Sequence, residues 1–268
     1  MKILKNDKGQ AVVNKSIKFS KEAFDNHNNT EIRWLGNGGV MINSQGTCIM
    51  IDPLLEGFDM ELLMDMPVTV KDVPFLDGIL VTHIDNDHFS RMTCNSLKDV
   101  TKKYYIVNYV ADVMKEEGYN VCKLDINDVF NINDIKVRVT PALHNWQNDL
   151  KKWQYRTWKL KDFCGYYLET KEGKIWMPGD SKLMDEHLNQ EEPDVILFDF
   201  SDNIWHISLE GAIKLANNYP NAKLLCIHWG CVDAFDKSAF NANPEDLFDR
   251  VINPDRILVL APGELYSL

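Results

Sequence analysis

Short apolar runs rich in β-branched residues recur along the chain and predict strands. Each run is bounded by polar or turn-forming residues, which is typical of buried or half-buried strands. The runs cover residues 48–52, 78–83, 104–110, 135–144, 164–170, 174–180, 194–200, 222–229 and 256–264.

Helical patterns lie between several of these runs. Residues 111–119 reach Gly118, which suits the C-terminal end of a helix. Ser208 is a suitable N-cap for the segment that follows it, and Asn243 and Pro244 precede a segment with acidic residues in its first turn. This order predicts an α/β protein with two layered sheets covered by helices. We expect residues 31–268 to form one domain, with residues 1–30 as an N-terminal extension packed on it.

Composition narrows the class of protein. The chain has 268 residues, of which 45% are hydrophobic and 26% charged, an ordinary globular balance. We expect a cytoplasmic protein without a membrane span, because no apolar run is long enough and the first ten residues lack a signal-peptide pattern. The net charge of −11 argues against nucleic acid as a partner. The six cysteines show no Cys-x-x-Cys spacing, so we expect free thiols.

Candidate metal ligands follow the predicted strands. The stretch "VTHIDNDHFS" (81–90) holds two imidazoles and two carboxylates within six residues. Strands that end at the same sheet edge can bring such side chains together, as a two-metal site requires. Unrelated polar residues are the alternative, but four of the seven histidines end apolar runs, which favours a metal site. The candidates are His83, Asp85, Asp87, His88, His144, Asp180 and His228.

Four motifs give the chain a resemblance to a known family. "THIDNDH", "TPALHN", "MPGDS" and "CIHWG" have the order and approximate spacing seen in the metallo-β-lactamase superfamily, over residues 30–268. "HISLEGA" (206–212) and "APGE" (261–264) resemble the branch with ascorbate-6-phosphate lactonase and N-acylphosphatidylethanolamine-hydrolysing phospholipase D. The resemblance implies an αββα sandwich of two mixed β-sheets flanked by helices, with the metal site at one edge of the sheets.

The resemblance also implies a ligand set for two divalent ions. The first ion would be held by His83, Asp85 and His144. The second would be held by Asp87, His88 and His228. Asp180 would bridge the two ions, and Asp52 of "MIDPLL" would orient ligands through hydrogen bonds from behind. Zinc or manganese is expected, with iron as a further candidate.

Asp85 departs from the superfamily pattern, which usually has a histidine at this position. A carboxylate is a harder and more anionic ligand than an imidazole. Three outcomes stay open: a preference for manganese or iron over zinc, weaker binding at the first position, or an Asp85 that turns away and leaves one well-held ion.

The implied chemistry is hydrolysis by a hydroxide that bridges the two ions. By analogy, Asp87 would orient this nucleophile and move a proton. His206 would face the cleft and bond the substrate or leaving group, although a helix-entry histidine without a chemical role is the alternative. We predict a metal-dependent hydrolase of a small, anionic ester, lactone or phosphoester. Its rivals are a nuclease or phosphodiesterase, a di-iron redox protein and a non-catalytic metal-binding regulator.

Residues 145–163 are basic and aromatic within an otherwise acidic chain. They predict either a loop that covers the site and binds an anionic substrate, or a structural segment with its aromatics in the core and its lysines in water. Trp146, Lys151, Arg156 and Trp229 are the candidate substrate-binding residues. The sequence leaves open whether the protein forms a homo-oligomer.

Overall fold

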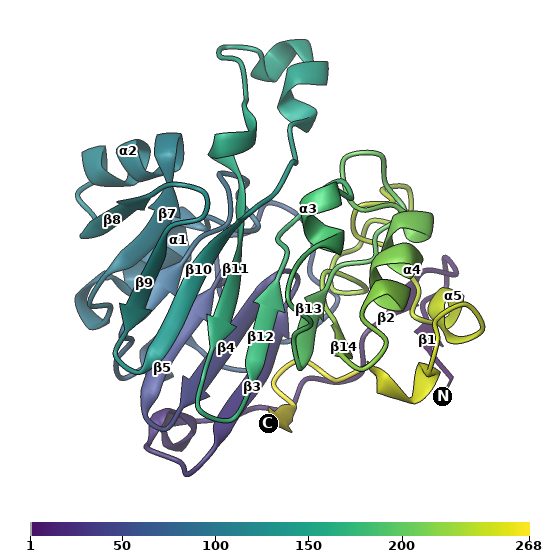
Figure 1. Ribbon diagram of the computed structural model, residues 1–268, viewed down its shortest axis with the longest axis horizontal. Coiled ribbons are helices and arrows are strands. Elements are labelled where there is room, and N and C mark those ends of the chain that lie inside the picture. The colour runs from purple at the N-terminus through teal and green to yellow at the C-terminus, as the bar shows by residue number, and fades with distance from the viewer. Residues whose placement is uncertain (1) are drawn as a thin grey trace.

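The computed structural model describes residues 2–268, in which two seven-stranded mixed sheets lie one over the other (Figure 1). The first sheet has the strand order β15-β14-β13-β12-β11-β10-β9, and the second has the order β16-β3-β4-β5-β6-β7-β8. The strands of the first are β9 (Val129–Ile132), β10 (Ile135–Pro141), β11 (Cys164–Glu169), β12 (Lys174–Met177), β13 (Val195–Phe198), β14 (Lys223–Cys226) and β15 (Ile257–Leu258). Those of the second are β3 (Thr30–Gly36), β4 (Gly39–Ser44), β5 (Thr47–Ile51), β6 (Gly78–Leu80), β7 (Tyr104–Val107), β8 (Val121–Leu124) and β16 (Leu265–Ser267).

Short helices flank the two sheets. They are α1 (Arg91–Ser96), α2 (Asn108–Glu116), α3 (Asp185–Leu188), α4 (Leu209–Asn218) and α5 (Glu245–Phe248). α2 packs against β7 and β8, while α3 and α4 contact each other beside the other sheet (Figure 1). This arrangement confirms the predicted αββα sandwich. No helix among residues 2–268 has the length and apolar character needed to cross a membrane.

The helix boundaries follow local chemistry. Ser208 caps α4 as predicted, because its side-chain oxygen accepts a hydrogen bond from the backbone N–H of Gly211 at 3.2 Å. The strand predicted over 104–110 is wrong beyond Val107, where α2 begins at Asn108. Asn108 has φ +40°, a backbone conformation that asparagine tolerates and that turns the chain from strand to helix.

Buried aromatic residues join the two sheets. Tyr166 of β11 is fully buried, and its hydroxyl donates to the carbonyl oxygens of Val81 at 2.8 Å and Tyr105 at 3.0 Å in the other sheet. These bonds satisfy a polar group that would otherwise destabilise the core by about 1–3 kcal/mol. They also fix the end of β6, from which the ligand-rich stretch continues.

The N-terminal residues run along the main body of the molecule. β1 (Leu4–Lys5) and β2 (Ala11–Val12) form a separate two-stranded sheet. Backbone N–H groups of Val13, Ile17 and Phe19 then donate to carbonyls of the main body at 2.8–3.2 Å. Within residues 16–27 the helical element is the 3₁₀ turn η1 (Lys21–Phe24).

A lobe formed by residues 145–163 connects β10 to β11 and rises above the edges of both sheets (Figure 1). It contains the 3₁₀ turns η4 (Trp146–Asp149), η5 (Lys151–Trp153) and η6 (Leu160–Asp162). The remaining 3₁₀ turns are η2 (Val70–Asp72), η3 (Lys98–Val100) and η7 (Pro254–Arg256).

Candidate metal centre

Histidine and aspartate side chains from both sheets converge at the base of the lobe. The ligand-rich stretch follows β6, and the other members follow β10, β12, β13 and β14. Their candidate ligand atoms form three-residue groups in which all atoms lie within 4.8 Å of one another. These groups are His83, Asp85 and His144; Asp87, His88 and His228; His83, His88 and Asp180; His144, Asp180 and His206; and Asp199, His206 and His228. The structure therefore brings together all seven residues predicted to hold metal.

The first group contains the unusual Asp85. Its Oδ2 lies 3.4 Å from Nε2 of His83 and 3.4 Å from Nε2 of His144. Asp85 thus turns toward the two imidazoles, and the geometry does not support the outcome in which it turns away.

The second group forms on the other side of the cluster. Nε2 of His228 lies 3.3 Å from Oδ2 of Asp87 and 3.3 Å from Nε2 of His88. Nε2 of His88 is also 3.4 Å from Oδ2 of Asp87. The three candidate ligand atoms therefore lie close enough together for one cation to bind all of them.

Asp180 lies between the two groups. Its Oδ2 is 3.1 Å from Nε2 of His88, 3.4 Å from Nε2 of His228 and 3.6 Å from Nε2 of His206. It also shares a ligand group with His83 and another with His144. This is the position that a bridging carboxylate requires.

The outer nitrogen of each imidazole is anchored to an oxygen atom. When Nδ1–H donates to this oxygen, Nε2 is left with a free lone pair that faces the cluster. The pairs are His83 with Thr82 Oγ1 (2.9 Å), His88 with Asp52 Oδ2 (2.8 Å), His144 with the carbonyl of Trp205 (2.9 Å), His206 with Asp199 Oδ2 (2.7 Å) and His228 with the carbonyl of Ala239 (3.1 Å).

The donor set fits divalent cations. Nε2 of His83 is buried and has no hydrogen-bond partner among residues 2–268. Five carboxylates lie in or directly behind the cluster, and within the described part of the chain all of their ion pairs are with histidines. Because uncompensated charge is costly to bury, the cluster requires cations or protons.

The pKa shifts show the same demand for positive charge. Burial lowers the pKa of His88, but the carboxylates of Asp180, Asp87 and Asp52 outweigh burial and raise this pKa well above its usual range. Burial also opposes a charged His228, yet Asp180 and Asp87 raise its pKa to about 9. Burial raises the pKa of Asp180, but the facing imidazoles hold it well below its usual range. Without metal, the cluster therefore takes up protons.

The backbone around the cluster is tightly constrained. Asp52 and His228 have φ values of +47° and +59°, which non-glycine residues rarely adopt and which cost about 1 kcal/mol or more. The N–H of His228 donates to the carbonyl of Asn37 at 2.8 Å, and the Asn37 amide donates to Asp87 Oδ2 at 2.9 Å. A Cβ atom at Gly38 would come 2.7 Å from Cε1 of His88, so only glycine allows the β3–β4 turn to approach this closely.

Sequence reasoning missed three residues at the site. Asp199 directly follows β13 and binds His206, and the signal that could have revealed it is a carboxylate after a buried run. Gln147 donates to Asp85 Oδ1 at 2.8 Å from the lobe, and Asn37 reaches Asp87 from the β3–β4 turn. Neither amide has a local sequence signal.

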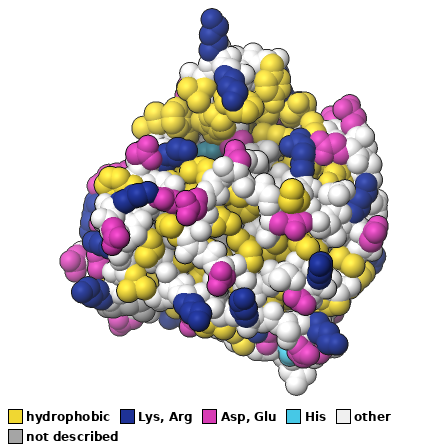
Figure 2. Space-filling model, turned by 180° about the vertical axis from the view of Figure 1, so that it is seen from behind, with side chains coloured by type: hydrophobic (Ala, Val, Ile, Leu, Met, Phe, Trp, Pro, Cys, Tyr) yellow, Lys and Arg dark blue, Asp and Glu magenta, His cyan; other side chains and the backbone are white. Residues whose placement is uncertain are grey.

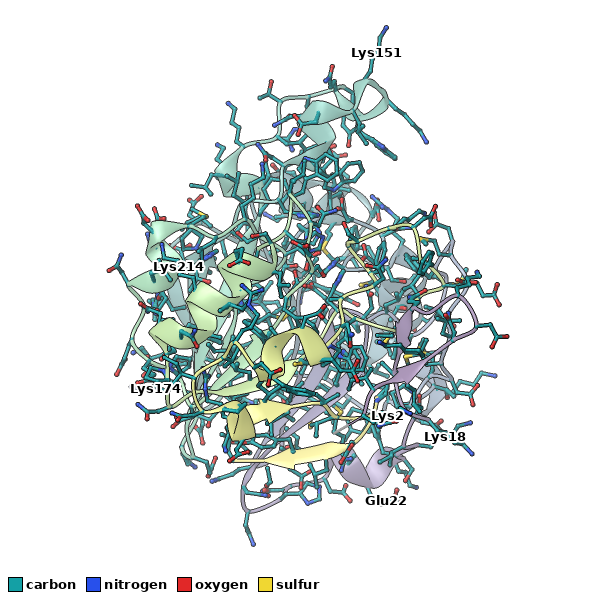
Figure 3. All side chains as sticks on the ribbon, turned by 90° about the vertical axis from the view of Figure 1, so that its right-hand side faces the viewer. Lys2, Lys18, Glu22, Lys151, Lys174 and Lys214 are labelled. Carbon is teal, nitrogen blue, oxygen red and sulfur yellow. The ribbon has the colours of Figure 1, made fainter. Side chains whose placement is uncertain are left out.

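The four candidate substrate-binding residues are placed differently. Trp146 adjoins the first group, because its indole N–H donates to Asp85 Oδ2 at 2.6 Å. Lys151 lies at the tip of the lobe and points into solvent (Figure 3). The Arg156 guanidinium stacks 3.8 Å over the Tyr109 ring and pairs with Asp162, while Trp229 is only 2% exposed and stacks on Trp34. Trp229 therefore offers a substrate no surface.

Comparisons with known proteins identify the family of this chain. Residues 47–229 match a family model described as the β-lactamase superfamily domain. A metal-dependent hydrolase of Caldivirga maquilingensis is 25% identical over 246 residues, which cover 88% of this chain and 97% of that protein. An N-acyl-phosphatidylethanolamine-hydrolyzing phospholipase D 1 of Caenorhabditis elegans is 22% identical over 231 residues, which cover 74% of this chain and 63% of that protein.

A solved structure supports the fold independently. Igni18, described as a metallo hydrolase from Ignicoccus hospitalis, matches with a TM-score of 0.70 at 15% identity, over 90% of this chain and 98% of its own. Because the family model covers more than half of the sequence, the chain belongs to the metallo-β-lactamase superfamily.

Proposed function

We propose that this protein is a metal-dependent hydrolase that cleaves a small, anionic ester, lactone or phosphoester. The observation that carries the proposal is the pair of three-residue ligand groups, with Asp180 between them and every imidazole Nε2 directed inward. Two divalent ions bound there would lower the pKa of a bound water and polarise the oxygen of the scissile group.

The proposed metal ligands form one set for each ion. We assign His83, Asp85 and His144 to one ion. We assign Asp87, His88 and His228 to the other, with Asp180 shared by both ions and Asp52 behind them.

Asp87 and His206 are the proposed catalytic residues. The Asn37 amide fixes Asp87 Oδ2, so this carboxylate is held where it can orient the attacking water and accept its proton. His206 keeps Nε2 toward Asp180 while Asp199 holds its Nδ1, so its ring is oriented to bond the substrate or the leaving group.

Two observations support the proposed substrate class. The net charge of −11 disfavours long nucleic acids, whereas the lysines of the lobe give a local positive region for a small anion. The C. elegans relative is named for hydrolysis of a phospholipid, which makes phosphodiesters the first bonds to try.

Asp85 supports one rival, a di-iron redox protein of the same fold. Its carboxylate is a harder ligand than imidazole and suits iron or manganese better than it suits zinc. A metal-binding regulator without turnover would use the same donor set and is the other rival.

Metal analysis followed by an activity panel tests the proposal. Protein purified without added metal is analysed for bound ions, then assayed on phosphodiesters, lactones and carboxylic esters before and after chelation. We expect chelation to abolish hydrolysis and manganese or zinc to restore it, with Asp180→Ala as the inactive control. An iron-loaded, coloured protein that consumes oxygen would favour the redox protein, and a metal-replete protein inert on the whole panel would favour the regulator.

A further inference from the structure

The lobe contacts the first ligand group through two side chains that donate to the same carboxylate. Trp146 Nε1 donates to Asp85 Oδ2 at 2.6 Å, and Gln147 Nε2 donates to Asp85 Oδ1 at 2.8 Å. Both residues belong to η4 at the base of the lobe. Each oxygen of Asp85 is therefore held by a different lobe residue, while Oδ2 faces His83 and His144.

The chemistry of these donors suits a metal ligand. An indole N–H and a carboxamide N–H are neutral, so they orient the carboxylate without cancelling its negative charge. A lysine or arginine in their place would compete with a cation for Asp85. The two bonds thus leave the charge of Asp85 available to an ion between the imidazoles.

Asp85 holds the Gln147 amide in one orientation, which leaves the amide oxygen without a partner. The Gln147 side chain is only 1% exposed, and its Oε1 is buried with no partner among residues 2–268. An unpartnered buried oxygen is unfavourable. Turning the amide over would place Oε1 against Asp85, so the carboxylate determines which way the amide lies. Such a cost at a buried residue is expected where the orientation serves a site.

The same lobe is also tied to His144. Trp205 Nε1 donates to Asp149 Oδ2 of the lobe at 2.7 Å, and the carbonyl of Trp205 accepts from His144 Nδ1 at 2.9 Å. Within the lobe, the Trp146 ring packs edge-on against Trp153 with centroids 5.9 Å apart. The lobe thus contacts Asp85 directly and is linked to His144 through Trp205, so it is connected to two of the three members of the first ligand group. Figure 2 shows hydrophobic side chains gathered over this part of the molecule, with basic side chains at its apex.

We infer that Trp146 and Gln147 are positioning residues that hold Asp85 as a metal ligand. Through these two hydrogen bonds the lobe completes the first ligand group. The inference rests on the proposed metal site and adds to it a structural reason why an aspartate can serve at this position. It also implies that the ion in the first ligand group is bound more weakly when the lobe is displaced.

Titration of metal-free protein with Co²⁺, followed by visible absorption and by competition with a chelator, tests the inference. Trp146→Phe keeps the aromatic packing and removes the N–H, and Gln147→Leu removes the amide at similar volume. We expect each to weaken one class of Co²⁺ site about 10- to 100-fold and to leave the other unchanged. Trp153→Phe is the matched control, because it changes a lobe tryptophan that has no bond to Asp85.

Two further measurements separate positioning from a general loss of structure. Gln147→Leu removes an unpartnered buried oxygen but also the donor to Asp85 Oδ1, so these two effects on thermal stability oppose each other. The melting temperature of the metal-free variant should therefore change little while its Co²⁺ affinity falls. In an Asp85→Ala background, Trp146→Phe should cause no further loss of Co²⁺ affinity.

Three outcomes would overturn the inference. These are unchanged affinity in both variants, an equal loss in Trp153→Phe, or a full additional loss in the Asp85→Ala background. A wild-type protein that binds no metal would instead overturn the proposed function together with the inference.

Discussion

Asp52 accepts a hydrogen bond from His88 Nδ1 at 2.8 Å, with both side chains fully buried. The same carboxylate accepts from the backbone N–H of Thr82 at 2.7 Å and from its hydroxyl at 2.5 Å. The Thr82 hydroxyl oxygen in turn faces Nδ1 of His83 at 2.9 Å. One carboxylate therefore orients an imidazole of each ligand group.

Asp52→Asn should weaken metal binding at both positions. An amide offers one acceptor oxygen where Asp52 uses two, so Thr82 or His88 must lose its partner. We expect affinity to fall about 10- to 100-fold, measured by competition with a metal-sensitive dye. Asp77→Asn is the matched control, since Asp77 is another buried carboxylate that accepts from Cys48 N–H and Asn133. It should cost stability only, and equal metal loss in both variants would contradict the role of Asp52.

Asp180→Ala should remove metal and turnover together. Its Oδ2 lies close to the imidazoles of His88 and His228 in the second ligand group, and it also shares ligand groups with His83 and His144 of the first, so no neighbouring carboxylate can take its place. We expect the variant to bind fewer ions than the wild type and to lose more than about 100-fold in activity. Loss of a residue that only supports a metal ligand already costs about 10- to 100-fold, and Asp180 is proposed as a ligand itself. Elemental analysis beside the activity assay checks both. A fully metallated and active variant would remove Asp180 from the ligand set.

Asp85→His should move metal preference toward zinc. Imidazole is a softer and uncharged ligand, and the charge that favours manganese or iron is lost. We expect the ratio of zinc to manganese affinity to rise about tenfold or more, because one ligand of the first group changes in type. Paired titrations with both ions measure this ratio. If preference and occupancy stay the same, Asp85 is not a ligand.

The strand-end ligands were predictable because their signal is local. A histidine or aspartate directly after a buried run is visible in the sequence, and the edge of a sheet brings such residues together. Asp199 carries the same signal after β13 and was overlooked, although its bond to His206 makes it part of the cluster. The helix cap at Ser208 was predictable for the same reason, since a cap depends on residues three positions apart.

Contacts that depend on tertiary packing could not be predicted. Lys151 follows His144 closely along the chain, yet the lobe carries it to a tip in solvent (Figure 3). Trp229 follows His228, whose left-handed backbone turns the chain so that the indole enters the core. Gln147 contacts Asp85 across 62 positions of sequence, and no pattern within either segment indicates that pairing.

The metal-free protein should lose stability as pH rises through the range 6.5–9. The folded state raises the pKa values of His88 and His228, the latter to about 9, from about 6.5 in the unfolded chain. The stability that these groups contribute is complete below about pH 6.5 and is lost as pH rises through their folded pKa values. Asp87 and Asp180 have lowered pKa values, so their contribution is present above about pH 4 and is lost toward acid. Burial lowers the pKa values of His83 and His187, so these two groups cost stability as pH falls below about 6.5. Melting temperatures of chelated protein should therefore be highest near about pH 6.5, and a maximum near pH 9 would contradict the charge assignment.

Metal binding near pH 7.5 should release protons. At that pH the raised pKa values keep His88 and His228 protonated in the metal-free protein, whereas a ligating Nε2 must be deprotonated. The ion that binds the second ligand group therefore displaces these protons, and its apparent affinity should increase as pH rises toward about 9. Calorimetric titrations in two buffers of different ionisation enthalpy measure the number of protons released. His228→Gln should reduce this number while His187→Gln, a change at a buried histidine bonded to the Pro141 carbonyl outside the ligand groups, should not. Equal proton release in all three proteins would show that His228 does not exchange a proton for metal.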